Sequence, residues 1–157
     1  MTTTNAMRIL QRAGIEFGTS EYEVDESDLS GVHAAEALGT DPDCVFKTLV
    51  CRGDKRGISV FCIPVAEELD LKKCATVTGD KRIEMIHVKE LLGLTGYIRG
   101  GCSPIGMKKK YPTWIDETAM LSDRIYVSAG MRGQQIIIAP DDLKNCITAE
   151  YADLTKR

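Results

Sequence analysis

Two apolar segments separated by a short charged turn constrain the fold more than any other feature of the sequence. Residues 45–51 and 58–65 are rich in β-branched and aromatic side chains, and the turn GDKRG at residues 53–57 separates them. Segments of this length and composition form strands, and a glycine-containing turn of this size joins them as a hairpin. The sequence therefore predicts a β-hairpin across residues 45–65.

The other segments predict short helices and strands in no regular order. Ser30 and Asp70 can cap helix N-termini, and Gly39 can end a helix. Helices are expected over residues 4–13, 30–39, 88–92 and from 70 and 140, and extended segments over residues 16–24, 83–86, 124–128 and 135–138. A glycine-rich loop spans residues 96–106. Without βαβ alternation, repeats or linkers, the pattern indicates an α+β fold around a largely antiparallel or mixed sheet, with residues 1–157 as a single domain.

The composition is that of a globular protein large enough for its own core. The chain has 157 residues, of which 43% are hydrophobic and 27% charged. No apolar run is long enough to cross a bilayer, and the N-terminal MTTTNAMRIL lacks the features of a secretory signal. We therefore expect a cytoplasmic protein with no membrane partner.

The net charge of −3 argues against a protein that coats nucleic acid indiscriminately. It leaves room for a local basic patch. The densest positive segment is the lysine run (Lys108, Lys109 and Lys110), which Tyr111 follows. Such a run is more often a solvated loop than a binding site.

The cysteines and histidines do not have the spacing of a metal centre. None of the six cysteines forms a CxxC pair, and neither His33 nor His87 has a second ligand at helical spacing. The motifs of P-loop and dinucleotide-binding proteins are also absent. We therefore predict no metal, no cofactor and mostly structural, reduced thiols.

The usual nucleophile motifs are missing as well. Ser103 lies among glycines, but the spacing is not GxSxG, and Pro104 has no backbone N–H for an oxyanion hole. Cys102 has no identifiable histidine partner, so a cysteine nucleophile is the less favoured interpretation. The amides of Gly100 and Gly101 could instead point at a developing negative charge, although a glycine pair is often only a tight connection.

Lys47 is unusual because it lies within the apolar segment VFKTLV at residues 45–50. Strand alternation puts it on the same side as Val45 and Leu49. If that face is buried, the lysine needs an anion or an acceptor. If the face is exposed, Lys47 is an ordinary surface lysine, and alternation alone does not decide between the two.

Several blocks of the sequence resemble the YbaK family. They are VFKTL at residues 45–49, LDLKK at 69–73, GYIRGGCSPIGMKK at 96–109, YVSAG at 126–130, and Arg132-Gly133. The blocks follow the order and spacing of the family and span nearly the whole chain, and the most specific of them is GGxSPxGxKK. The family also includes the editing domain inserted in some prolyl-tRNA synthetases and several free-standing relatives.

The resemblance implies a compact α+β domain with a mixed, partly barrel-like sheet and short surrounding helices. It implies an aminoacyl-tRNA deacylase that cleaves the ester at the tRNA 3′-end in trans, with Cys-tRNA(Pro) as the expected substrate. A pocket that selects proline discriminates small side chains by only about 1–3 kcal/mol, so a second hydrolytic step is needed. Prolyl-tRNA synthetase is a possible further partner, in a ternary complex.

The resemblance also assigns residues. The catalytic positions are Lys47, Gly100 and Gly101, and the substrate-binding positions are Tyr22, Ser30, Ser103 and Ser128. Two positions depart from the family: Ser30 (or Leu29) aligns with a pocket phenylalanine, and Gln135 aligns with an acidic residue. Both departures bear on amino-acid specificity rather than on the catalytic framework. Lys108, Lys109 and Lys110 are expected to contribute to tRNA binding.

The mechanism that the resemblance implies needs no nucleophile from the enzyme. The terminal ribose hydroxyl would help to position a water molecule, or the thiol of the substrate would attack its own ester. Lys47 would hold the phosphate or ribose of the last nucleotide, and the glycine amides would bind the oxyanion. The alternatives are a deacylase for another small amino acid, such as alanine, and a non-catalytic module that binds aminoacyl-tRNA or a synthetase. A degenerate copy would lose the lysine or the glycine pair, so their presence favours the enzyme.

Overall fold

The computed structural model of the chain describes residues 2–156. Its helices are α1 (Asn5–Arg12), α2 (Gly31–Leu38), α3 (Leu71–Thr78), α4 (Val88–Thr95) and α5 (Pro140–Cys146), with 3-10 turns η1 (Pro42–Cys44) and η2 (Glu117–Leu121). Its strands are β1 (Gly18–Glu21), β2 (Phe46–Gly53), β3 (Gly57–Pro64), β4 (Ile83–Met85), β5 (Thr113–Asp116), β6 (Ile125–Ser128), β7 (Gln134–Ile138) and β8 (Glu150–Ala152). No helix among these is long and apolar enough to span a membrane.

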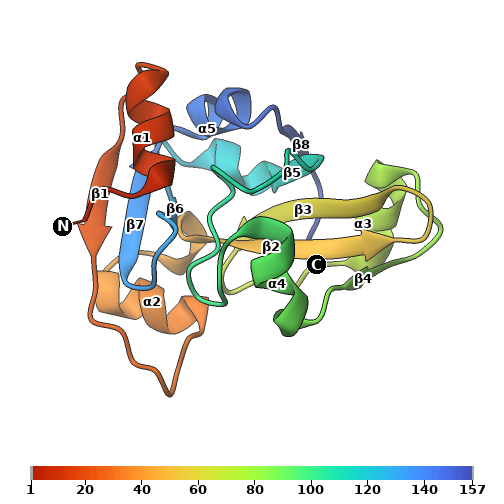
Figure 1. Cartoon of the computed structure of the whole chain (residues 1–157), viewed down its shortest axis with the longest axis horizontal. Helices are drawn as coiled ribbons and strands as arrows, with labels where there is room; N and C mark the ends of the chain where they lie inside the picture. The colour runs from red at the N-terminus through yellow and green to blue at the C-terminus, as the bar shows by residue number, and fades with distance from the viewer. Residues whose placement is uncertain (1, 157) are drawn as a thin grey trace.

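The strands form two sheets, and the predicted hairpin lies at the centre of the larger one. That sheet has the order β4-β2-β3-β5-β8, and β2 pairs antiparallel with β3 from Phe46 opposite Pro64 to Gly53 opposite Gly57. Figure 1 shows the hairpin extending to one end of the molecule beside α3 and β4. Strands β3, β5 and β8 are parallel neighbours, so the sheet is mixed.

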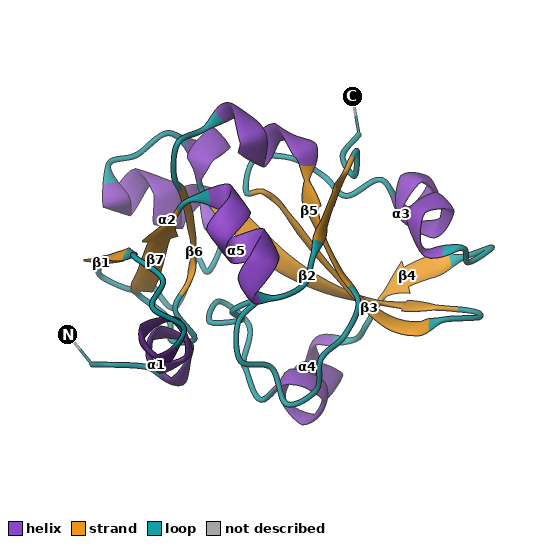
Figure 2. Ribbon diagram, turned by 90° about the horizontal axis from the view of Figure 1, so that it is seen from above, coloured by secondary structure: helices purple, strands orange, loops and turns teal. Residues whose placement is uncertain are grey.

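The smaller sheet has the order β1-β7-β6 and is antiparallel throughout. Figure 2 shows it at the end of the molecule opposite the hairpin turn. The two sheets meet where Val45 forms an isolated parallel bridge to Tyr126. The predicted α+β fold with a mixed sheet is confirmed, and the two sheets do not close into a barrel.

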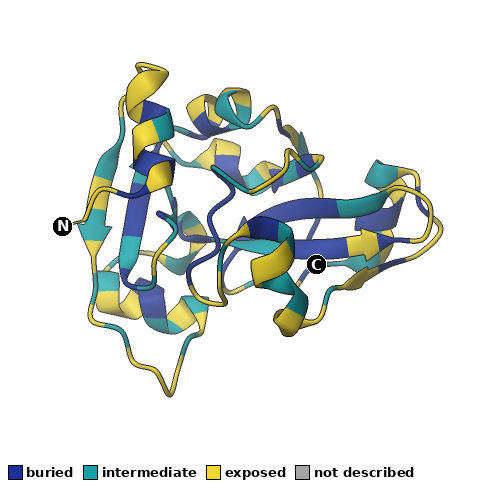
Figure 3. Cartoon of the chain, in the orientation of Figure 1, coloured by how far each residue is buried: buried dark blue, intermediate teal, exposed yellow. Residues whose placement is uncertain are grey.

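Apolar side chains from both sheets and the helices form the core, and the buried segments in Figure 3 follow the strands. The largest cluster joins α1 to both sheets through residues such as Leu10, Phe46 and Ile136. A second cluster packs α3 and the C-terminal segment against the larger sheet through Phe61 and Leu154. Burial of these side chains is the main favourable term in folding.

Local capping accounts for the positions of the helices. The hydroxyl of Ser30 accepts from His33 N at the start of α2, and the carboxylate of Asp70 accepts from two amides at the start of α3. Gly39 ends α2 with a φ of 67°. Both predicted helix starts and the predicted end at Gly39 are therefore confirmed.

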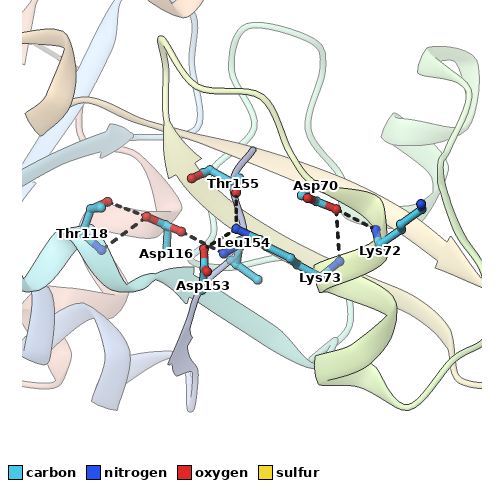
Figure 4. Close-up of polar contacts among 8 residues, drawn as sticks. All are labelled: Asp70, Lys72, Lys73, Asp116, Thr118, Asp153, Leu154 and Thr155. Carbon is cyan, nitrogen blue, oxygen red and sulfur yellow. Dashed lines mark hydrogen bonds and ion pairs between the residues drawn. The ribbon is translucent and has the colours of Figure 1, made fainter. Parts of the chain in front are cut away.

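Strands β5 and β8 were not predicted from the sequence. They have four and three residues, and they are placed by parallel pairing with distant segments. A buried carboxylate helps to fix them: Asp116 accepts from Leu154 N at 3.0 Å and from the Thr118 hydroxyl at 2.5 Å. Lys73 adds bonds to Asp153 and to the carbonyl of Thr155, as Figure 4 shows. The C-terminal segment is thus tied to the sheet by polar contacts as well as by packing.

Candidate active site

A cavity of about 570 Å³ lies where α2, α4, the first half of β2 and the glycine-rich loop come together. Its volume is within the range of small-molecule sites, and most of its lining is apolar, as in such sites. The lining residues that could contact a polar group are Tyr22, Ser30, Lys47, Thr48, Arg99, Gly100, Cys102, Ser128 and Gln135. The cavity therefore combines residues from segments that are far apart in the sequence.

An unpaired stretch of strand edge forms one wall of this cavity. On one side β2 pairs with β3 along its whole length, but on the other side β4 pairs only with Cys51 to Gly53. Val45 bridges to Tyr126 at the opposite end. No described strand covers residues 46–49 between these two contacts, and residues 45–50 all line the cavity. The open edge lets a ligand approach β2 directly.

Lys47 lies on this open edge and is half-buried. Its ammonium makes no hydrogen bond or ion pair with any residue that the structure describes. Burial lowers the pKa of Lys47, and the more distant Glu68 and Glu67 offset part of that effect. A partly desolvated ammonium with free donors, facing a cavity, is suited to bind an anion.

The glycine-rich loop reaches the cavity through a tight turn. The Gly101 N–H donates to the carbonyl of Ile98 at 2.9 Å, and Gly100 within this turn has a φ of 84°. Glycine adopts this conformation without the steric cost that a side chain adds. Gly100 lines the cavity, and its N–H donates to no described residue. The amide of Gly100 is therefore free to bind a ligand oxygen.

Arg132 holds the glycine-rich loop in place through its guanidinium group. Its Nε donates to the carbonyl of Arg99 at 2.8 Å, and its Nη1 pairs with Glu26 at 2.9 Å. One guanidinium thus links the glycine-rich loop to the connection between β1 and α2. The geometry of the Gly100 turn consequently depends on Arg132.

The structure places two of the residues assigned from sequence outside the cavity lining. The amide of Gly101 is engaged in the turn, and Gly101 is buried outside the cavity lining. Ser103 is fully buried, and its hydroxyl accepts from Ile105 N at 3.2 Å, so it shapes the loop and does not reach the cavity. Of the two amides for which an oxyanion role is predicted, only that of Gly100 has no partner among the described residues, because the Gly101 N–H closes the turn.

The other predicted substrate-binding residues do line the cavity. They are Tyr22, Ser30 and Ser128, which come from the segment after β1, from the start of α2 and from the end of β6. The hydroxyls of Ser30 and Ser128 accept from His33 N and Gly130 N, both at 3.2 Å. A hydroxyl that accepts one bond still has its own proton to donate.

Sequence reasoning missed one charged lining residue. Arg99 lines the cavity directly before Gly100, and only its position beside the glycine pair could have indicated it. The lysine run is exposed and lies outside the lining. The part of the chain that the structure describes has no cluster of three or more His, Cys, Asp or Glu side chains able to hold a metal ion.

A second cavity, of about 470 Å³, has the opposite electrostatic character. Asp41, Asp43 and Glu67 line it, beside a Cys44–Ser122 contact at 3.4 Å. Three carboxylates disfavour a polyanionic ligand. The first cavity is therefore the better candidate for an anionic ligand.

Cys102 lines the first cavity, but its surroundings do not activate it. Burial raises the pKa of the Cys102 thiol to about 12, and neither histidine lines the cavity. A thiol in that state has almost no thiolate at neutral pH. Cys102 therefore lacks the features of a nucleophile.

We expect Cys102→Ala to retain activity within about threefold of the wild type, while stability falls by about 1 kcal/mol. Steady-state hydrolysis of charged tRNA, the reaction that the resemblance implies, and urea unfolding measure the two effects. Cys62→Ala, at a core thiol outside the cavity, is the matched control. Covalent catalysis would be indicated if the folded Cys102→Ala protein lost activity by a hundredfold or more while the Cys62→Ala protein remained active.

Known proteins share both this sequence pattern and this architecture. The family described as the aminoacyl-tRNA editing domain matches residues 29–146. EbsC of Enterococcus faecalis, described as a candidate Cys-tRNA(Pro)/Cys-tRNA(Cys) deacylase, is 46% identical over 154 residues, covering 98% of this chain and 94% of EbsC. A proline–tRNA ligase of Shouchella clausii is 32% identical over 121 residues, which are 77% of this chain and 21% of the ligase.

A solved structure has the same fold. The crystal structure of a candidate trans-editing enzyme for prolyl-tRNA synthetase matches with a TM-score of 0.81 at 24% identity, covering 99% of this chain and 100% of the other. The expected resemblance to the YbaK family is thereby confirmed. The chain belongs to the aminoacyl-tRNA editing domain family.

Proposed function

We propose that this protein is a trans-editing hydrolase that cleaves the ester of mischarged aminoacyl-tRNA, with Cys-tRNA(Pro) as its main substrate. The observation that carries this proposal is that Lys47, whose ammonium has no described partner, and Gly100, whose amide is free, line the same cavity. Family membership supports the reaction class, and the description of EbsC supports the amino acid and the tRNA.

Two groups of the enzyme act directly on the substrate in this proposal. The Lys47 ammonium binds the phosphate or ribose of the terminal nucleotide, and the Gly100 N–H donates to the ester carbonyl oxygen as negative charge develops on it. Since these donors are held by β2 and by a fixed turn, they need little rearrangement during the reaction. Tyr22, Ser30 and Ser128 contact the aminoacyl group.

The substrate supplies the attacking group. In one route the cysteine thiol attacks its own ester carbonyl, the bond to the ribose oxygen breaks, and that oxygen takes up the thiol proton. The resulting thiolactone is then opened by water. In the other route, a water molecule held by the neighbouring ribose hydroxyl attacks the ester directly. Neither route needs Cys102 or a metal ion.

The whole chain, residues 1–157, acts in this proposal as one editing domain. The likeness to part of a proline–tRNA ligase supports a further step, in which prolyl-tRNA synthetase and this protein share the tRNA in a ternary complex. Such a complex would let the editing domain act before the charged tRNA leaves. Co-migration of protein, synthetase and tRNA in size-exclusion chromatography measures this complex.

A release assay with labelled amino acids tests the proposal. Purified protein is mixed with Cys-tRNA(Pro), Ala-tRNA(Pro), Pro-tRNA(Pro) and Cys-tRNA(Cys), and free amino acid is counted over time. We expect release from Cys-tRNA(Pro) to be fastest and Pro-tRNA(Pro) to resist. Fastest release of alanine would reassign the amino acid, and tight binding without any release would point to a non-catalytic module.

The lysine run is expected to contribute to affinity rather than to chemistry. Lys108, Lys109 and Lys110 are exposed and directly follow the glycine-rich loop. Changing all three to alanine should weaken tRNA binding and flatten its dependence on salt, by about 0.7–0.9 in log–log slope for each lost phosphate contact. Filter binding between about 50 and 200 mM salt, the range over which such contacts have large effects, measures the slope. The triple arginine variant is the control and should keep the salt dependence of wild type. An unchanged slope in the alanine variant would show that the run is only a solvated loop.

A further inference from the structure

The charged groups that face the cavity are all cations. Among the described lining residues, Lys47 and Arg99 are charged, and Tyr22 and Cys102 are the other titratable groups. No carboxylate of a described residue lines the cavity; Glu67 and Glu68 act on Lys47 from outside it. A ligand with an anionic part is favoured here, but a positively charged amino group would be repelled.

Gln135 is the most buried polar side chain in the lining. It lies on β7, is 6% exposed, and its Oε1 has no hydrogen-bond partner among the described residues. Its cross-strand neighbours are Ser128 on β6 and Ser20 on β1, and Ser128 also lines the cavity. A buried amide without a partner is costly, and a ligand that supplies a donor removes that cost.

The neighbouring residue shows that the unpaired atom alone does not mark a site. Gln134 also has a buried Oε1 without a partner among the described residues, but it does not line the cavity. Because successive residues of a strand point to opposite faces, only Gln135 of the two points to the ligand side. This pair therefore offers a matched control on the same strand.

An aminoacyl-tRNA end has a polar group, the α-amino group, that the other cavity groups leave unassigned. Lys47 and Arg99 suit its phosphate and ribose, and the Gly100 amide suits its carbonyl oxygen. In its uncharged form the α-amino group donates to an acceptor. Gln135 supplies an uncharged one beside the hydroxyl of Ser128.

We propose that the side-chain amide of Gln135 binds the α-amino group of the substrate as a neutral acceptor, so that the site selects the uncharged amine. This inference rests on the proposed function and adds the way in which the amino acid is recognised. An unperturbed α-amino group titrates at about pH 7.7–8.0. With two cations in the lining and no carboxylate, binding should therefore strengthen as pH rises through the amine pKa.

Two non-hydrolysable ligands test this assignment: 3′-cysteinylamino-adenosine 5′-phosphate and its analogue without the α-amino group. Calorimetry at pH 6 and pH 8 gives their affinities for wild type, Gln135→Met, Gln135→Glu and the control Gln134→Met. For wild type at pH 8 we expect about a fivefold preference for the amine-bearing ligand, the value of one hydrogen bond of about 1 kcal/mol. Gln135→Met should lose this preference, and Gln134→Met should keep it.

Gln135→Glu gives a second readout that a purely structural role would not produce. A carboxylate holds the ammonium form, so the amine-bearing ligand should bind this variant better at pH 6 than at pH 8, the reverse of wild type. The inference is wrong if Gln135→Met keeps the preference for the amine-bearing ligand, or if Gln135→Glu has the same pH dependence as wild type. If wild type still hydrolyses Cys-tRNA(Pro) in that case, the proposed function stands. If wild type neither binds the ligands nor releases cysteine, the proposed function fails, and this inference fails with it.

Discussion

Lys47→Ala is expected to yield a folded protein that releases cysteine from Cys-tRNA(Pro) at close to the uncatalysed rate. Lys47 lies half-buried on the open edge of β2 and has no described partner, so its removal leaves the fold intact. Removing one member of a buried, hydrogen-bonded charge pair costs about 2–5 kcal/mol. Each 1.36 kcal/mol is a factor of ten in rate, so we expect kcat/KM to fall by roughly a hundredfold or more.

Two further variants make this result specific. Lys47→Arg should restore little activity, because a planar guanidinium does not occupy the place of a compact ammonium in a narrow site. Arg52→Ala is the matched control: Arg52 is a cation of the same strand, outside the cavity, and its ion pair with Glu90 is a surface pair of small energy. A folded Lys47→Ala protein that keeps more than a tenth of wild-type activity would place the chemistry elsewhere.

Gly100→Ala is expected to have the second largest effect. At a φ of 84°, a side chain adds about 1–2 kcal/mol of backbone strain. The new Cβ would also lie 3.3 Å from Arg132 Nε, the atom that holds the loop. The turn must shift to relieve the backbone strain and the close contact with Arg132, and the Gly100 N–H moves with the turn. Loss of one oxyanion donor lowers kcat by about 10²–10³-fold, so a displaced donor should cost at least tenfold.

Gly79→Ala separates this catalytic effect from simple strain. Gly79 ends α3 with the same φ of 84° and lies outside the cavity. A methyl group on Gly79 would meet only the side chain of Arg56, at 3.8 Å, which is an ordinary contact. Both variants should lose similar stability in urea unfolding, but only Gly100→Ala should lose activity in single-turnover hydrolysis. Equal activity in the two variants would remove the Gly100 amide from the mechanism.

Features determined by neighbouring residues were predictable from the sequence. The hairpin follows from two β-rich segments and one turn, and the helix boundaries follow from caps such as Ser30 and Asp70. Strands β5 and β8 were not predictable, because three or four residues carry no clear period and distant strands determine their pairing. Their place in the sheet is a property of the whole fold.

The site was predictable in part for the same reason. Strand alternation could not decide the environment of Lys47, because the deciding feature is the gap between the Val45 bridge and β4. A glycine pair does not reveal which amide closes a turn and which remains without a partner; in the structure the Gly101 N–H closes the turn. Arg99 and Gln135 are far from Lys47 in the sequence, and only the folded structure brings all three into the lining of one cavity.

A co-crystal structure with 3′-cysteinylamino-adenosine 5′-phosphate tests the central claim most directly, because it shows where the aminoacyl end lies. We expect the ligand in the first cavity, with its carbonyl oxygen about 2.7–3.1 Å from the Gly100 nitrogen and its phosphate or ribose in hydrogen-bond contact with Lys47. A ligand in the second cavity, or one bound in the first cavity with its carbonyl oxygen away from Gly100, would contradict the account.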